Sequence, residues 1–116
     1  MIVPANSATH AGVTRSAFAG TITAVTYTPR TTLTGAATDS RTVTVVNETQ
    51  SKTAATLAFT SGVNATAVTP KVITVSGTAA NVAVAAGDVI TVKSTHVGST
   101  GLADPGGLFS LTFRRA

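Results

Sequence analysis

Alternation of β-branched apolar residues with threonine is the feature that most restricts how this chain can fold. In residues 41–47 (RTVTVVN), Val43 and Val45 fall on one face and threonines on the other. A repeat of two residues is that of a β-strand with one buried face. The pattern recurs in every apolar segment from residue 18 onward, and no segment has the spacing of an amphipathic helix. Threonine and valine also favour strands over helices, so the sequence predicts an all-β chain with almost no helix.

Turn residues divide the chain into short segments spaced about ten residues apart, as in all-β sandwiches. In the first segment, Ile22 and Ala24 are assigned to one face and Val25 and Tyr27 to the other. We expect seven to eight short strands, with a brief extended piece near residue 33 and the main strands within 18–27, 41–47, 53–60, 71–76, 81–85, 89–95 and 108–115. The predicted fold is an antiparallel β-sandwich of the jelly-roll or Greek-key type, with its domain at residues 18–116.

Residues 1–17 show neither alternation nor helical spacing. Their mixture of Pro, Gly, Asn, Ser and Ala is typical of an extended N-terminal arm. Two interpretations stay open: a frayed terminus, or an arm that becomes ordered on a partner. For the second, the candidate partner-binding residues are Thr9, His10, Val13 and Arg15.

Small side chains limit the size of the core. The 116 residues include 24 Thr, 20 Ala and 15 Val, which together make up half of the chain. A chain of this length forms one domain. Alanine contributes little apolar area, so we expect a core that is real but thin.

The charge balance is basic but weak. The net charge is +4, yet only 10% of the residues are charged, and the excess reflects a shortage of acids. Apart from Arg114 and Arg115, the basic residues are dispersed along the chain. We interpret them as a mildly basic, solvated surface, or alternatively as a weakly positive face that docks on an acidic protein. Aromatic residues are only 4% of the chain, so nucleic-acid binding is not expected.

Signals for chemistry are few. A catalytic triad would have to combine His96, Asp104 and a serine, but the chain has no G-x-S-x-G motif. The glycine-rich stretch 98–101 is not followed by the Lys-Ser/Thr of a phosphate loop, and the four acids are scattered. With no cysteine and two histidines, we expect no enzyme activity, no metal and no cofactor or small-molecule substrate. We also expect no membrane span and no secretory signal peptide, and therefore synthesis in a cytoplasm.

Four stretches in this order resemble the small head-decoration (capsid cement) proteins of tailed bacteriophages that infect actinobacteria. They are residues 18–29 (FAGTITAVTYTP), 58–65 (AFTSGVNA), 84–90 (VAAGDVI) and 101–108 (GLADPGGL), the last followed by the closing strand. The resemblance covers residues 18–116, and its weight lies in the order and spacing of the four pieces. The arm at residues 1–17 has no counterpart in it.

The resemblance implies a jelly-roll-like homotrimer on the outer surface of the virion, made in the host cytoplasm. Its partner would be the major capsid protein, whose subunits it would tie together. The alternative is a tail-tip or fibre module that binds glycans of the host surface. Such a module needs exposed aromatic side chains, and the sequence has a single tyrosine, Tyr27, and no tryptophan.

Overall fold

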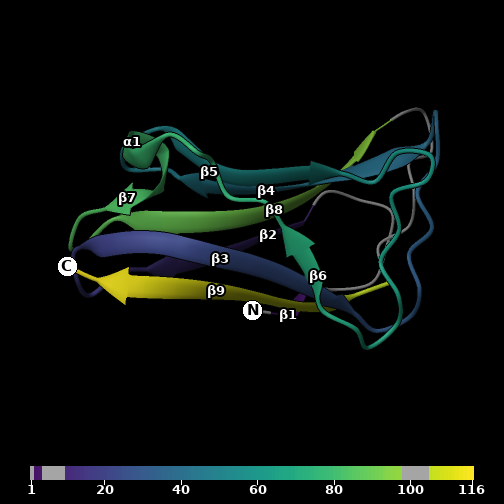
Figure 1. Ribbon diagram of the computed structural model, residues 1–116, viewed down its shortest axis with the longest axis horizontal. Helices are drawn as coiled ribbons and strands as arrows, with labels where there is room; N and C mark the ends of the chain where they lie inside the picture. The colour runs from purple at the N-terminus through teal and green to yellow at the C-terminus, as the bar shows by residue number, and fades with distance from the viewer. Residues whose placement is uncertain (1, 4–9, 98–104) are drawn as a thin grey trace.

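Two antiparallel sheets form the protein, whose computed structural model describes residues 2–3, 10–97 and 105–116 (Figure 1). The first sheet has the order β1-β9-β3-β6, with β7 also paired to β3, and the second has the order β2-β8-β4-β5. The strands of the first sheet are β1 (Ile2–Val3), β3 (Gly20–Pro29), β6 (Lys71–Ile73), β7 (Ala83–Val84) and β9 (Gly107–Arg115). Those of the second are β2 (His10–Arg15), β4 (Ser40–Asn47), β5 (Lys52–Ala58) and β8 (Val89–Val97). The expectation of a mostly antiparallel β structure is confirmed.

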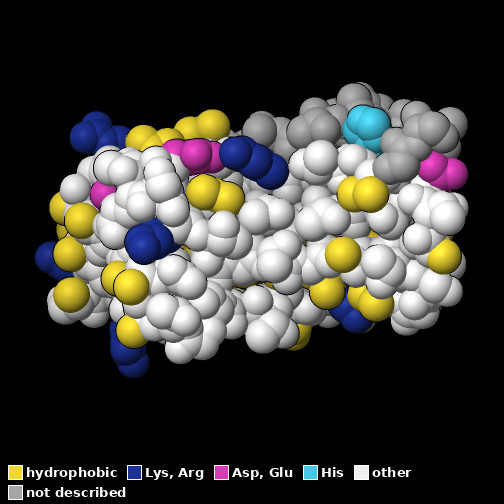
Figure 2. All heavy atoms as spheres, turned by 90° about the horizontal axis from the view of Figure 1, so that it is seen from above, with side chains coloured by type: hydrophobic (Ala, Val, Ile, Leu, Met, Phe, Trp, Pro, Cys, Tyr) yellow, Lys and Arg dark blue, Asp and Glu magenta, His cyan; other side chains and the backbone are white. Residues whose placement is uncertain are grey.

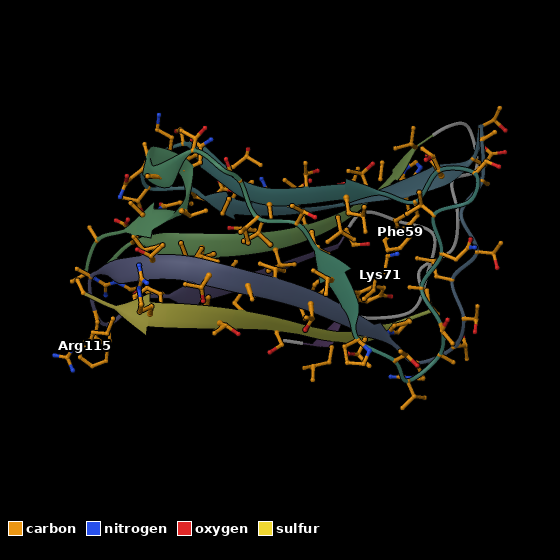
Figure 3. The ribbon with its side chains drawn as sticks, in the orientation of Figure 1. Phe59, Lys71 and Arg115 are labelled. Atoms are coloured by element: carbon orange, nitrogen blue, oxygen red, sulfur yellow. The ribbon has the colours of Figure 1, made fainter. Side chains whose placement is uncertain are left out.

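The core lies between the two sheets and draws on both. Val43 and Val45 of β4 are almost fully buried, as their alternation predicts. Three aromatic rings fill one end of the core: Tyr27 stacks on Phe109 with 4.7 Å between ring centroids, and it meets Phe59 edge-on at 6.2 Å. Figure 3 shows Phe59 between the layers, at the end opposite to Arg115. Most of the other buried core residues are Val, Ile and Ala, and Phe113 and Leu111 of β9 pack against them while only partly buried.

A β-bulge in β3 corrects the predicted faces of that strand. Ile22 pairs with Phe113 and Ala24 with Thr112, so Thr23 is an extra residue without a counterpart in β9. The extra residue shifts the alternation by one position. Ile22 therefore lies in the core together with Val25 and Tyr27, rather than on the opposite face. The hydroxyl of Thr23 donates to the carbonyl of Thr112 and holds the bulge against β9.

Part of the predicted extended N-terminal arm, residues 1–17, belongs to the second sheet. Residues 10–15 form β2, which pairs with β8 along its whole length, from His10 opposite Ser94 to Arg15 opposite Val89. The sequence hides this strand because its residues, HAGVTR, do not alternate in hydrophobicity. The sheet-forming part of the chain therefore begins ahead of residue 18.

A short helix replaces part of the strand predicted at residues 81–85. The helix α1 spans Ala79–Val82, and only Ala83 and Val84 form a strand, β7. Val82 of the helix and Val84 of the strand are both buried. A helical turn followed by β7 therefore brings the same apolar residues into the core as the predicted strand would have done. No helix in the described residues has the length and apolar composition to cross a bilayer.

The connection after β6 joins the two sheets along one side. β6 pairs with β3 in the first sheet, whereas Val75 forms a bridge with Ala55 of β5 in the second. The amide of Ser76 also donates to the carbonyl of Ala54 at 2.7 Å. One chain segment thus crosses from sheet to sheet and covers part of the edge of β5.

Candidate partner-binding surface

Three of the four predicted partner-binding residues lie on β2, the edge strand of the second sheet. His10 begins the strand, while Val13 and Arg15 follow two residues apart and are both exposed, Val13 to 68%. Thr9 lies outside the described residues. An exposed valine on an edge strand is a feature of surfaces that pair with another chain.

An apolar groove runs between β2 and β9, where the two sheets face each other. It has two hollows: one of about 430 Å³ lined by Val13, Thr14, Phe109 and Leu111, and one of about 230 Å³. The second lies closer to the C-terminal end of β9 and is lined by Thr14, Arg15, Ser16, Ile22, Val84, Ile90, Leu111 and Phe113. Thr14 borders both hollows.

The groove exists because β2 places small residues opposite large ones. Thr14 pairs with Ile90 and Gly12 with Val92, and both of these β8 residues are buried in the core. Position 14 therefore takes the inward register of β2, where a threonine leaves more space than a larger side chain would. Phe113 and Leu111 of β9 remain only partly buried as a result.

The outer edge of β9 is free over most of its length. β1 pairs with β9 only at Leu108 and Gly107, and it runs antiparallel to it. From residue 109 to residue 115, β9 has no strand partner on that edge within the described part of the chain. The groove thus combines unfilled apolar space with a row of backbone groups that can pair with another strand.

Three arginines, here called the arginine cluster, belong to the end of the protein where β2 and β9 end. Arg15 ends β2, and its Nε donates to the carbonyl of Gly87 at 3.2 Å. Arg114 and Arg115 end β9, and the guanidinium of Arg115 lies 4.0 Å from the ring centroid of Phe18. Figure 3 shows Arg115 pointing away from the molecule at this end.

No carboxylate side chain among the described residues pairs with these three arginines. An ion pair elsewhere on the surface joins Lys93 of β8 to Glu48, which follows β4, with 2.7 Å between Nζ and Oε1. Its hydrogen bond and charge hold the pKa of Glu48 below the ordinary value. Elsewhere the surface is poor in charge, and in Figure 2 the charged side chains are scattered over a mostly uncharged face. The arginine cluster is therefore an unbalanced positive site on a weakly charged protein.

One basic residue departs from the predicted solvated surface. Arg41 is fully buried, because it takes the inward side of β4 with Val43 and Val45. Its Nη1 donates to the hydroxyl of Ser94 at 3.0 Å. A buried guanidinium needs such hydrogen bonds to offset its lost hydration. Arg41 therefore belongs to the interior and contributes no charge to a docking face.

The acid Asp88 has a structural role. It is 4% exposed, and its Oδ2 accepts hydrogen bonds from the side-chain amides of Asn47 and Gln50 and from the backbone amide of Ala85. These bonds, led by that from Asn47, lower the pKa of the Asp88 carboxyl. They tie the turn after β4 to the turn before β8. The sequence does not indicate this role, because the donors Asn47 and Gln50 lie 41 and 38 residues away along the chain.

The residues considered for catalysis are not assembled into a site in the described structure. His96 lies in β8 opposite Arg41, and its Nδ1 is buried without a hydrogen-bond partner among the described residues. Asp104 lies outside those residues. Across the described ranges, no three His, Asp or Glu side chains form a group that could hold a metal ion.

Comparison with known protein families, with curated proteins and with solved structures finds no match to this chain. The groove therefore has to be interpreted from its own chemistry. The sequence did contain its signals: the spacing of Phe109, Leu111 and Phe113, and the paired arginines that follow them. The sequence did not predict that β2 lies across the groove from these β9 residues, because β2 has no hydrophobic pattern.

Proposed function

We propose that the chain is a phage capsid decoration protein that binds the outer surface of the major capsid shell and stabilises it. The observation that carries the proposal is the open apolar groove, together with three arginines at one end of it that have no carboxylate side-chain partner in the described part of the chain. Such a surface fits an acidic protein partner better than a small molecule, because it is elongated, edged by free backbone groups and charged only at one end. The resemblance of residues 18–116 to capsid cement proteins supplies the identity of that partner.

The strand order supports a jelly-roll type of sandwich. β3 pairs with β9 in one sheet while β4 pairs with β8 in the other, so these two pairs are nested in sequence order, although β2 also pairs with β8. Nested antiparallel pairs divided between two sheets are typical of jelly rolls. A decoration protein of this type would act as a homotrimer.

Avidity is the mechanism that we propose for stabilisation. Each subunit offers a modest contact area, and three linked subunits convert weak single contacts into tight attachment. Six large apolar side chains are exposed in the described structure, which is surface that a trimer and a shell could cover. They are Val13, Phe18, Val68, Val72, Val97 and Leu108.

A phage that lacks this gene tests the proposal. We expect its particles to assemble but to lose filled heads on heating more readily than wild-type particles, with unchanged adsorption to host cells. Unchanged heat survival with lost adsorption would instead favour the tail-tip or fibre module. The single tyrosine weighs against glycan binding, since Tyr27 is 1% exposed and stacks inside the core.

A further inference from the structure

We infer that the groove between β2 and β9 receives an extended, acidic segment of the capsid protein, which adds to the free edge of β9 as a new strand. The inference rests on the proposed capsid role and names the surface and the type of contact. Its first support is that the edge already accepts a strand. β1 pairs antiparallel with β9 at Leu108 and Gly107, and the line of β1 continues along residues 109–115.

The hollows supply the side-chain contacts for such a strand. An added strand presents every second side chain to the core side, where the hollows beside Thr14, Leu111 and Phe113 lie. Their volumes, about 230 and 430 Å³, are large enough for apolar side chains to enter. Backbone pairing would give affinity, and the hollows would select which residues alternate in the segment.

The arginine cluster sets the charge of the segment. Arg114 and Arg115 end β9, and Arg15 borders the second hollow at the same end. A segment antiparallel to β9 begins at this end, so its acidic residues should lie at its N-terminal side. Three cations without a carboxylate partner in the described structure would each gain a charge-assisted contact.

A second copy of this chain fits the groove less well. The whole chain has only four acidic residues. Of these, Glu48 already pairs with Lys93, and Asp88 is buried in its hydrogen bonds. A copy with net charge +4 would bring further positive charge to the cluster. The occupant is therefore a different and more acidic protein.

Binding of purified variants to isolated shells that lack the decoration protein tests this. The first variant, Thr14→Phe, places a large side chain at the position that borders both hollows, and the matched control is Thr56→Phe, on an exposed position of β5. The second variant reverses Arg15, Arg114 and Arg115 to Glu, and its control reverses Arg30, Lys52 and Lys71. We expect each groove variant to bind about tenfold more weakly or worse, and the controls to bind like wild type.

Melting temperatures measured alongside show that the variants are folded. Thr14→Phe should melt no lower than wild type, since it fills empty space. If the triple reversal fails to fold, the double variant Arg114→Glu with Arg115→Glu is used in its place. This double variant keeps the hydrogen bond from Arg15 to Gly87. Hydrogen exchange on the shell adds a direct readout, because those amides of residues 109–115 that point away from β3 should exchange more slowly once a strand pairs with them.

The outcomes separate the two proposals. If wild type binds shells but Thr14→Phe binds equally well, or exchange in residues 109–115 is unchanged, strand addition in the groove is wrong and the capsid role stands. If Thr14→Phe instead dissociates a trimer of the free protein, the occupant is a second copy and the inference is overturned. If wild type does not bind shells at all, the capsid role is wrong and the inference fails with it.

Discussion

The side-chain amide of Asn47 donates a hydrogen bond of 2.8 Å to the carboxylate of Asp88, and this bond joins two turns that are 41 residues apart in sequence. Gln50 and the backbone of Ala85 donate to the same oxygen. One carboxylate thus fixes both the β4–β5 hairpin and the entry into β8. The arrangement leads to a test by pH.

Asp88→Asn should destabilise the protein at neutral pH and change its acid sensitivity. The pKa of Asp88 is lower in the folded protein than its ordinary value of 3.8. The stability that it contributes is therefore complete above that value and is lost as the pH falls through the folded pKa. Melting temperatures measured from neutral pH down to strongly acid pH should differ most between wild type and Asp88→Asn near neutrality, and converge in acid.

Glu48→Gln serves as the comparison for that experiment. The pKa of Glu48 in the wild-type protein is also lowered, by Lys93, so the contribution of Glu48 to stability also disappears in acid. Glu48 is exposed, however, and exposed ion pairs contribute little. If Glu48→Gln lowers the melting temperature as much as Asp88→Asn does, the buried hydrogen bonds of Asp88 do not explain the destabilisation of Asp88→Asn.

Phe59→Ala should lower the free energy of unfolding by about 3–5 kcal/mol, because it removes a fully buried ring and leaves a cavity beside Tyr27. Chemical denaturation measures this loss. Phe18→Ala is the matched control, since Phe18 is 48% exposed and should cost much less. Equal losses would contradict the position of the core.

The bulge at Thr23 can be tested by two changes of different size. Thr23→Ala keeps the extra residue and removes only the hydrogen bond to Thr112, which should cost about 1 kcal/mol. Deletion of Thr23 removes the bulge and forces Ile22 to the outer face or out of register. That should cost at least the burial of an isoleucine, about 1.5–3 kcal/mol, by denaturant unfolding. If the deletion lowers the free energy of unfolding by less than Thr23→Ala does, the bulge is refuted.

Truncation separates β2 from the residues that precede it. Removal of residues 1–17 takes away the whole of β2 and exposes the edge of β8, so the melting temperature should fall well below that of a chain lacking only residues 1–9. The extended-arm interpretation instead expects both truncations to melt almost like wild type. Thermal unfolding followed by circular dichroism distinguishes them.

Alternation was sufficient to predict most of the strands and the inward faces of β4 and β9. It failed where a single backbone event changed its phase, as at Thr23, or where a strand had no apolar pattern, as in β2. The assignment of Arg41 to solvent came from its residue type, because arginine is mostly exposed; alternation itself places Arg41 on the buried side of β4 with Val43 and Val45. The groove depends on which strands face each other, and that is a long-range relationship that local spacing does not contain.

The crossing at residues 74–76 makes the two long sides of the protein mechanically unequal. Val75 and Ser76 fasten the sheets together beside β5, whereas β2 and β9 face each other across the groove. A force that separates the sheets should therefore open the β2–β9 side first, with the crossing acting as the hinge. A segment bound along β9, as we propose, would reinforce the weaker side, so attachment would protect this protein as well as its partner.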